Sequence, residues 1–493
     1  MSNTSHNTQI KRHLKTRHLS MIAIGGCIGT GLFMASGTAI HDAGPGGALI
    51  AYAAIGMMVY FLMTSLGEMA TYLPVSGSFS TYASRFVDPS LGFALGWNYW
   101  FNWVITVAAD VIMAAIVVTY WEPLRFMPPW AWSLIFFALI CILNMFSVKA
   151  YGESEYWFAI IKVFTVIIFL AIGILTIFGI LGGEYVGFKY LTEGEAPFLG
   201  EGISNKFLTM LGVFLIAGFS FQGTELIGIT AGESENPEES IPKAIKQVFW
   251  RILIFYILAI LVIGLLIPYT SPELLGADVD EIAKSPFTLV FERAGLAFAA
   301  AVMNAVILSS ILSAGNSGMY ASTRMLYAMG KDGLAWPFFS RTSKSGVPLH
   351  ALFATAIVIL TIFLLQLDQN IGKQMYQYIL AASGLTGFIA WLGIAISHYR
   401  FRRAYIAQGK DLNALIYRAK WFPIGPLLAL ALCVLVIIGQ DTDLVLKGDL
   451  NWHRLLITYM GIPIFLAFYS YHKLRYKTQK VPLLQVDLSR DTP

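Results

Sequence analysis

Three ionisable side chains lie deep within apolar stretches of the sequence, where they could carry protons or bind a charged ligand. Asp110, Lys162 and Glu225 each lie well inside a run that is long enough to cross a lipid bilayer. A charge at mid-membrane depth costs at least about 2.5–3.5 kcal/mol on insertion scales, so each needs a partner, a water-filled cavity or a change of protonation. Burial favours the neutral form of an acid or a lysine, which suits a proton carrier. A satisfied buried ion pair is the alternative for each residue.

Two apolar runs contain segments that weaken a helix. Residues 25–31 read GGCIGTG, and each glycine costs roughly 1 kcal/mol relative to alanine in a regular helix. Residues 218–225 read GFSFQGTE and combine helix-weak residues with polar side chains. The two segments lie five runs apart, which is typical of an inverted repeat whose broken helices 1 and 6 meet at the midplane. Close helix packing through small residues is the alternative interpretation.

A broken helix exposes peptide groups that lipid cannot satisfy. Its free N–H groups attract a carboxylate, and its free carbonyl groups attract an ammonium ion. An α-amino acid carries both charges, and glycines at 29 and 31 would let a carboxylate approach the backbone. The two interruptions therefore predict a site for a zwitterion.

Other polar residues in the runs have less specific interpretations. Tyr99 and Trp103 are spaced i, i+4 and either line a cavity or simply pack. Five glutamates near predicted helix ends are interpreted as interface charges or gating salt bridges, namely Glu68, Glu153, Glu155, Glu233 and Glu235.

The length and composition of the chain indicate the elements that must position these residues. Of its 493 residues, 57% are hydrophobic and 13% are charged, against roughly 25% charged in an average soluble domain. This excludes a soluble enzyme, a disordered protein and a disulfide scaffold, and the net charge of +4 does not indicate a nucleic-acid partner. We predict an all-α membrane protein with twelve transmembrane helices, with spans at about 19–41, 46–72, 91–119, 130–148, 154–181, 207–232, 247–268, 287–328, 350–367, 374–399, 424–440 and 452–471. The run at 287–328 is too long for one straight span.

Charge asymmetry predicts the orientation of the chain. The first apolar run follows a basic segment and has no convincing cleavage site, so we interpret it as an uncleaved first helix. Counted by predicted side, 24 Lys and Arg residues lie with the N-terminus and 8 lie opposite. The positive-inside rule then places both termini in the cytoplasm. The sequence has no spacing pattern of a metal site, a phosphate loop or a catalytic nucleophile, so we expect no metal, no cofactor and no enzymatic activity.

Several stretches resemble the amino-acid permeases of the amino acid–polyamine–organocation superfamily. They lie at 23–33, 43–49, 218–228 and 231–237. Within that superfamily the chain resembles the bacterial lysine-specific permeases most, through residues 96–100, 247–252, 313–324 and 386–400. The resemblance extends from about residue 15 to residue 470.

The resemblance implies a leucine-transporter-type fold, with ten helices in a five-plus-five inverted repeat and two added C-terminal helices. It divides the chain into a cytoplasmic tail at 1–17, a transport core at 18–400, helices 11 and 12 at 401–472 and a second cytoplasmic tail at 473–493. The implied function is proton-coupled uptake of L-lysine by alternating access, as a symporter in the bacterial cytoplasmic (inner) membrane. The implied partners are L-lysine, a proton and the lipid bilayer. The question of a regulatory partner in the membrane is left open.

The family pattern can be carried over residue by residue. It assigns the substrate carboxylate to the amides around Gly29, Thr30 and Gly31. The α-ammonium would meet the carbonyl groups of Cys27, Phe219 and Gln222, with the Phe219 ring as a lid. The full substrate-binding set is Cys27, Ile28, Gly29, Thr30, Gly31, Asp110, Phe219, Gln222, Glu225, Asn316 and Ser383.

The resemblance also implies how protons and the substrate side chain are held. Lys162 falls where sodium-coupled relatives bind sodium, so no sodium ion is expected. Lys162 and Glu225 are the candidate proton-coupling residues. Asp110, with Asn316 and Ser383 beside it, would hold the ε-ammonium of lysine, although only its depth in the run supports Asp110 independently.

Two other functions stay open at this point. The first is a permease of the same family for an aromatic or another cationic amino acid. The second is a membrane sensor that binds lysine and signals through a partner without transporting it. The tails total only about 40 residues and offer no room for a soluble signalling domain, which favours transport.

Overall fold

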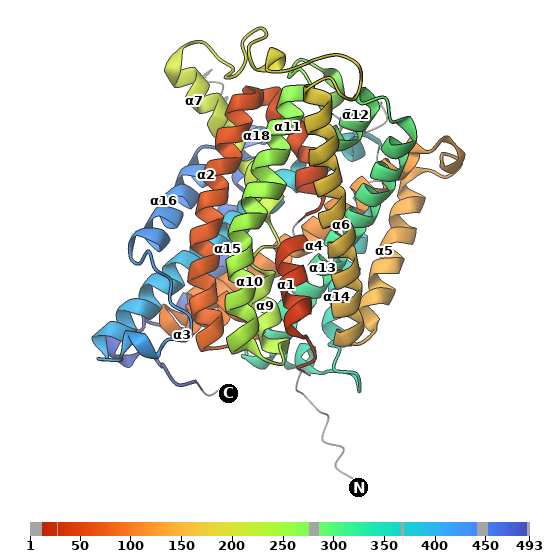
Figure 1. Cartoon of the computed structure of the whole chain (residues 1–493). Helices are drawn as coiled ribbons and strands as arrows, with labels where there is room; N and C mark the ends of the chain where they lie inside the picture. The colour runs from red at the N-terminus through yellow and green to blue at the C-terminus, as the bar shows by residue number, and fades with distance from the viewer. Residues whose placement is uncertain (1–11, 27, 276–284, 366–368, 441–451, 491–493) are drawn as a thin grey trace.

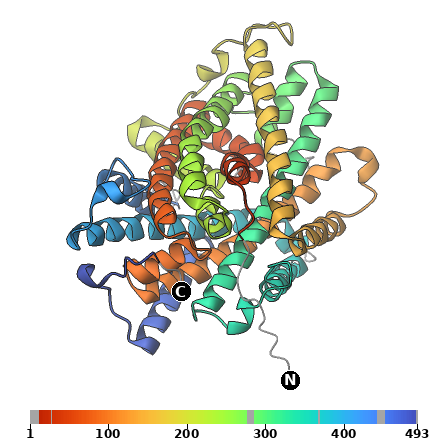
Figure 2. The same cartoon turned by 60° about the horizontal axis from the view of Figure 1, so that its bottom comes forward.

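The chain folds into a bundle of helices. The first and the last described residues of the chain lie at the same end of this bundle (Figure 1, Figure 2). The computed structural model describes residues 12–26, 28–275, 285–365, 369–440 and 452–490. Within these ranges all regular secondary structure is helical, and Leu14 and Ser234 form an isolated β-bridge. The prediction of an all-α protein is confirmed.

The first half of the chain contains one interrupted helix followed by long ones. Its helices are α1 (Thr16–Gly25), a π-helical turn (Gly31–Ala35) that leads into α2 (Ser36–Tyr72), α3 (Ser78–Phe86), α4 (Pro89–Val117), α5 (Pro129–Met145) and α6 (Val148–Ile177). The starts of α4 and α6 are capped by their own sequences. The Asp88 side chain accepts a hydrogen bond from the backbone N–H of Ser90, and the Ser147 side chain accepts one from Ala150.

The second half of the chain contains a second interrupted helix. Its helices are α7 (Gly202–Gly212), α8 (Phe214–Phe221), α9 (Leu226–Thr230), α10 (Pro237–Arg251), α11 (Leu258–Leu266), α12 (Pro286–Arg293), α13 (Ala297–Lys331), α14 (Leu349–Leu365), α15 (Gln369–Ala407), α16 (Ile424–Ile438), α18 (Trp452–Tyr459) and α19 (Gly461–Tyr476). A π-helical segment, Ile252–Ile257, joins α10 to α11.

The helices agree with most of the predicted runs and differ at three places. In the described residues, seven helices are long and apolar enough to cross a membrane, and three shorter apolar helices accompany them. The predicted run at 287–328 is divided between α12 and α13, because the chain turns at Gly295 with φ of +75°. The predicted loop near residue 44 is only a kink within α2, at Gly44. Helix α3 was not predicted, since its nine residues are too polar for a membrane span.

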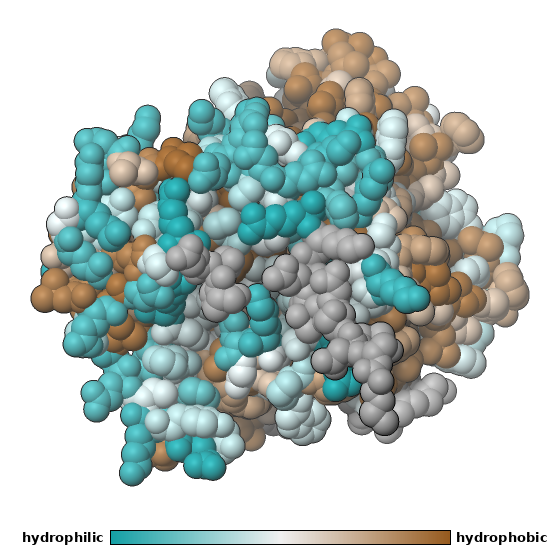
Figure 3. Space-filling view, turned by 90° about the horizontal axis from the view of Figure 1, so that it is seen from below, coloured by the Kyte–Doolittle hydropathy of each residue, from teal (hydrophilic) through white to brown (hydrophobic). Residues whose placement is uncertain are grey.

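Burial differs strongly between neighbouring helices. In its most apolar window α4 is 89% buried, and it packs against α13, α15, α3, α5 and α19. The corresponding window of α6 is only 33% buried, and large side chains such as Trp157 and Phe164 face outward. Viewed from below, the end of the bundle that holds both described chain ends is largely hydrophilic, and brown apolar patches lie toward the flanks (Figure 3). This distribution suits a bundle surrounded by lipid on its flanks.

Two ion pairs are buried near this hydrophilic end. The Arg402 guanidinium on α15 donates from Nε to Glu68 Oε1 on α2 at 2.6 Å. The Arg324 guanidinium on α13 donates from Nε to Oε1 of Glu233, which follows the end of α9, at 2.9 Å. All four side chains are almost completely buried. Glu68 and Glu233 therefore form the salt bridges that the sequence predicted.

We expect Arg402→Met to lower the free energy of unfolding by about 3–5 kcal/mol, because it removes the guanidinium from the buried Glu68 carboxylate and leaves it with the His398 ring at 3.3 Å. The measurement is the Tm of the purified protein in detergent. Arg403→Met is the matched control, since Arg403 is the next residue along the chain and is exposed. Equal Tm values for the two variants would contradict a structural role for the pair.

Candidate functional site

The first helix is interrupted where its glycines predict. Helix α1 ends at Gly25, Ile28 and Gly29 are not helical, and the π-helical turn begins at Gly31. The amide of Ile28 still donates to the carbonyl of Gly25 at 3.1 Å. Cys27, one of the predicted site residues, lies outside the described residues.

The second interruption separates α8 from α9. Gln222 leaves the helical region, with φ of −59° and ψ of 143°, and Gly223 has φ of +95°, which only glycine adopts without strain. The helix resumes at Leu226, directly after Glu225. The Phe219 carbonyl accepts the amide N–H of Gln222 at 3.2 Å, and the Phe219 side chain is 5% exposed.

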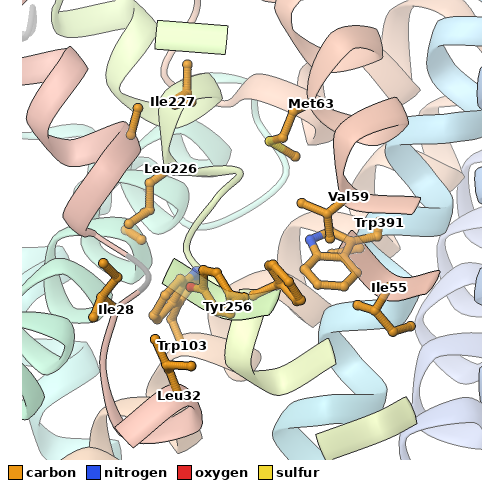
Figure 4. Close-up of a cluster of buried hydrophobic side chains, with 14 of the residues drawn as sticks. Ile28, Leu32, Ile55, Val59, Met63, Trp103, Leu226, Ile227, Tyr256 and Trp391 are labelled. Carbon is orange, nitrogen blue, oxygen red and sulfur yellow. The ribbon is translucent and has the colours of Figure 1, made fainter. Parts of the chain in front are cut away.

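The two interruptions lie side by side in the interior. A Cβ atom added to Gly31 would lie 2.4 Å from Ser220 Cα, so the two backbones are in direct contact. Ile28, Leu32, Trp103 and Leu226 belong to one cluster of buried side chains, in which Figure 4 shows Ile28 near Leu226 and Leu32 near Trp103. The peptide groups freed at both interruptions are therefore close enough to act on one small ligand.

Asp110 is held against the first interruption. The hydroxyl group of Thr30 donates to Asp110 Oδ1, and the Asp110 side chain is 3% exposed. A Cβ atom added to Gly315 on α13 would lie 3.5 Å from Asp110 Cβ. The carboxylate thus lies among α4, α13 and the start of the resumed helix, where it can accept a hydrogen bond from a cation.

Glu225 lies at the second interruption and is held by neutral donors. The Tyr99 hydroxyl donates to Oε1 at 3.1 Å, and the Trp391 indole N–H donates to Oε2 at 3.2 Å. The backbone amide of Gly223 donates to the same carboxylate at 3.2 Å. Tyr99 also stands edge-on to Trp103, with ring centroids 6.1 Å apart. Tyr99 therefore does more than pack, because it fixes a buried acid.

Two cations stabilise the carbonyl end of α1. Lys162 Nζ donates to the Gly25 carbonyl oxygen at 3.1 Å, and Arg251 donates to the Ala23 carbonyl oxygen. Both side chains are 1% exposed. A cation at the C-terminal end of a helix is favoured by the helix dipole. Arg251 was predicted only as a charge on one side of the membrane, because its acceptor comes from a helix more than 200 residues away.

Ser383 on α15 belongs to the second interruption. The Gln222 side chain donates from Nε2 to the Ser383 carbonyl oxygen at 2.8 Å, and the Ser383 hydroxyl donates to Gln222 Oε1 at 3.1 Å. The hydroxyl of Thr106 lies 2.6 Å from that of Ser383. Thr106 is one turn before Asp110 on α4, so it connects the two parts of the candidate site. The spacing of Thr106 from Asp110 is the signal in the sequence that could have identified it.

Asn316 is hydrogen-bonded to Glu155 and Asn144, and not to the residues with which the sequence analysis grouped it. Its Nδ2 donates to Glu155 Oε1 at 2.7 Å, and its Oδ1 accepts from Asn144 Nδ2 at 2.8 Å. Its amide therefore faces α5 and α6, whereas the sequence grouped it with Asp110 and Ser383. Glu155 is 2% exposed and is not the helix-end charge that we expected. The signal for its burial is its position seven residues before Lys162, on the same face of α6.

No metal centre is evident among those residues of the site that the structure describes. The described residues contain no group of three or more His, Cys, Asp or Glu side chains that could hold a metal ion. The arrangement instead offers two backbone interruptions, two buried acids and a buried lysine, which can bind a zwitterion and exchange protons.

Comparisons with known proteins agree over almost the whole chain. A family model described as amino acid permease matches residues 18–485. The lysine-specific permease of Escherichia coli strain K12 is 55% identical over 481 residues, which cover 96% of each chain. That of Lactococcus lactis subspecies cremoris is 56% identical over 492 residues, covering 99% of this chain and 95% of that protein. A histidine permease of the same lactococcal strain is 53% identical over 484 residues, covering 98% and 99%.

Solved structures match the fold at low sequence identity. Two crystal structures of a manganese transporter from Eremococcus coleocola cover 95% of this chain and 97% of their own, with TM-scores of 0.53 and 0.55 and 15% identity. At this identity the likeness concerns the fold alone.

We expect Gly31→Ala to separate the two interruptions, because its Cβ would overlap the Ser220 backbone, which cannot move aside as a flexible side chain can. Ligand binding should fall at least about tenfold, corresponding to about 1.4 kcal/mol, measured as ligand-induced thermal stabilisation. Gly425→Ala is the control, since its Cβ would meet side-chain atoms instead of a backbone, with Phe61 at 3.1 Å and Trp421 Cβ at 3.5 Å. Unchanged binding by Gly31→Ala would show that close contact between the interruptions is not required.

Proposed function

The chain belongs to the amino acid permease family, and from that membership we propose that it is a secondary active transporter that takes up L-lysine together with a proton. Its family and close relatives are permeases and not enzymes. Two relatives, at 55% and 56% identity, are lysine-specific permeases, which supports lysine as the substrate. The observation that carries the mechanism is the contact between two helix interruptions in the interior.

The proposed pose places the α-carboxylate of lysine on the first interruption. The amides of Gly29, Thr30 and Gly31 begin a helical segment, and such amides lack partners within the helix. The α-ammonium then lies near the carbonyl groups of Phe219 and Gln222 at the end of α8, the negative end of its dipole. Cys27 and Ile28 would complete the first interruption, and Phe219 would cover the ligand.

The ε-ammonium of lysine is proposed to reach Asp110. The carboxylate is buried and already accepts one hydrogen bond from Thr30, so it can accept another from an ammonium group. Ser383 and Gln222 border the same space from α15 and the second interruption. We assign Asn316 to the support of Glu155, because both ends of its amide are engaged there.

Proton coupling is proposed to act through Lys162 and Glu225. While Lys162 is charged, it binds the carbonyl end of α1 and holds that helix to α6. Loss of its proton weakens this attraction and lets α1 move, which opens the site toward the other side. Glu225 can take up a proton at the second interruption, next to the proposed α-ammonium.

The membrane arrangement is proposed as twelve spans in a five-plus-five inverted repeat with two added helices. The helical segment Gly31–Tyr72 has 42 residues and would measure about 63 Å, roughly twice the hydrocarbon thickness of a bilayer. The kink at Gly44 therefore divides it into two spans. The core would be residues 18–400, with 401–472 as the added helices and 1–17 and 473–493 as tails.

The hydrophilic end with both described chain ends is proposed to face the cytoplasm of a bacterium. The predicted topology assigns 24 of the 33 Lys and Arg residues to the side of the N-terminus, and the positive-inside rule places that side in the cytoplasm. Uptake would then proceed from the opposite end across the inner membrane.

Histidine is a second candidate substrate. The lactococcal histidine permease is 53% identical to this chain, only a few per cent below the lysine-specific relatives. Competition of labelled lysine uptake by unlabelled lysine, histidine and arginine decides between these substrates.

The decisive experiment is uptake of labelled lysine into proteoliposomes with an imposed inward proton gradient. We expect accumulation above equilibrium, which collapses when a protonophore is added. Binding without accumulation would overturn transport and favour a sensor that acts through a membrane partner. Preferential competition by histidine would transfer the proposal to that substrate.

We expect Lys162→Ala to abolish gradient-driven accumulation while leaving measurable lysine binding, because the variant loses the cation that responds to protons. Accumulation and binding are measured on the same preparation. Lys149→Ala, at an exposed lysine on the same helix, is the control. Full gradient-driven uptake by Lys162→Ala would refute its role.

We expect Asp110→Asn to weaken lysine binding about tenfold or more and to weaken a neutral amino acid much less, since only lysine loses a counter-charge. The measurement is competition by lysine and by its uncharged analogue norleucine. An equal loss for both ligands would remove Asp110 from specificity.

A further inference from the structure

Glu155 is a buried carboxylate for which the transport scheme has no role. Its two oxygens accept hydrogen bonds from α13: Ser313 Oγ lies 2.7 Å from Oε2, and Asn316 Nδ2 lies 2.7 Å from Oε1. Asn144 Nδ2 donates to Asn316 Oδ1 at 2.8 Å, which fixes the Asn316 amide with its NH₂ group toward Glu155. We call Ser313 and Asn316 the cradle. Burial of a charged carboxylate costs free energy, so the presence of Glu155 at this depth calls for an explanation.

The cation that attracts this carboxylate is Lys162. The two residues lie seven positions apart on α6, which places them on one helix face two turns apart. Long side chains on a helix point back toward its N-terminus, so Lys162 extends in the direction of Glu155. The ammonium and the carboxylate attract each other, while Lys162 Nζ donates to the Gly25 carbonyl oxygen.

The titratable and charged groups around this pair come from four helices. Asp110 on α4 also attracts Lys162, and Arg251 on α10 binds the α1 carbonyl two residues before Gly25. On the other side of Glu155, Tyr151 on α6 donates to Ser317, and on α13 Arg324 is paired with Glu233. The Asp110 carboxylate is bound by Thr30 and, in the proposed function, is needed by the substrate. Among the described residues, the hydrogen-bond donors to Glu155 are neutral side chains of α13, which leaves its charge for Lys162.

We propose that Glu155 is a positioning residue for proton coupling, held by the cradle so that its charge stabilises the protonated form of Lys162. The inference rests on the proposed function. The cradle ties the carboxylate to α13, and Lys162 binds the end of α1, so the attraction connects α1 to α13 through α6. When the Lys162 ammonium gives its proton to water, the N–H bond breaks, a hydronium ion forms and the neutral amine remains. The attraction to Glu155 then ends and α1 is released.

The test is Glu155→Gln, which keeps the shape of the side chain and removes its charge. The glutamine carbonyl can still accept from Asn316, and its NH₂ group can donate to the Ser313 hydroxyl, so the cradle stays bonded. Lysine uptake into proteoliposomes is measured against external pH at fixed internal pH. We expect the pH of half-maximal uptake to fall by about one unit, because the protonated lysine has lost a nearby anion, while the lysine Kd changes less than about threefold.

Glu153→Gln is the matched control, since Glu153 lies two residues away on the same helix and is bonded to Arg17 and His18 at the bundle end. Its pH of half-maximal uptake should not change. Where Glu155→Gln is well folded and its midpoint equals that of the control, the proposal is overturned.

A second variant serves if Glu155→Gln does not fold. Ser313→Ala/Asn316→Ala keeps the carboxylate but removes the cradle, so the charge on Glu155 becomes less stable and the midpoint should move in the same direction by a smaller amount. An unchanged midpoint in that variant also overturns the proposal. If the unaltered protein fails to accumulate lysine at all, the proposed function fails, which is a distinct outcome.

Discussion

The need to satisfy backbone polar groups away from water governs the centre of this protein. Two helices are interrupted in the interior, and lipid offers their peptide groups no partners. The protein supplies them with charges: Lys162 and Arg251 at the carbonyl end of α1, and Glu225 at an amide of the second interruption. Each charge is in turn kept in place by neighbours, such as Tyr99 and the Trp391 indole for Glu225. The backbone polar groups and the charged side chains therefore offset the free-energy cost of each other's burial.

The need to satisfy these backbone groups explains why the site contains both charged side chains and glycines. A glycine at residue 31 lets the two backbones touch, and a positive φ at Gly223 lets the chain turn between α8 and α9. The charges then stabilise the exposed peptide ends. In the proposed function a zwitterion binds to the same peptide groups, which is the chemistry that a permease for amino acids needs.

The sequence predicted the parts of the site that depend on local pattern. Clustered glycines predicted the first interruption, and helix-weak residues combined with polar side chains at 218–225 predicted the second. Depth within an apolar run singled out Asp110, Lys162 and Glu225. It could not predict partners from distant helices: Thr30 for Asp110 and Asn316 for Glu155 lie 80 and 161 positions away. Glu155 was wrongly predicted to be a helix-end charge, because it lies near the end of an apolar run in the hydropathy profile. Its burial depends instead on the packing of α13 against α6. The run at 287–328 was recognised as too long for one straight span, but its division at Gly295 was not located, since a single glycine does not interrupt a hydropathy profile.

The contrast between α4 and α6 has a consequence for how the surrounding lipid acts on the molecule. Helix α4 is enclosed by other helices, whereas most of the apolar window of α6 faces outward. A helix in contact with lipid adjusts its tilt when the bilayer becomes thicker or thinner. Lys162 and Glu155 are on the buried face of that helix, so we expect a change in acyl-chain length to affect them more than it affects Asp110 on the enclosed α4.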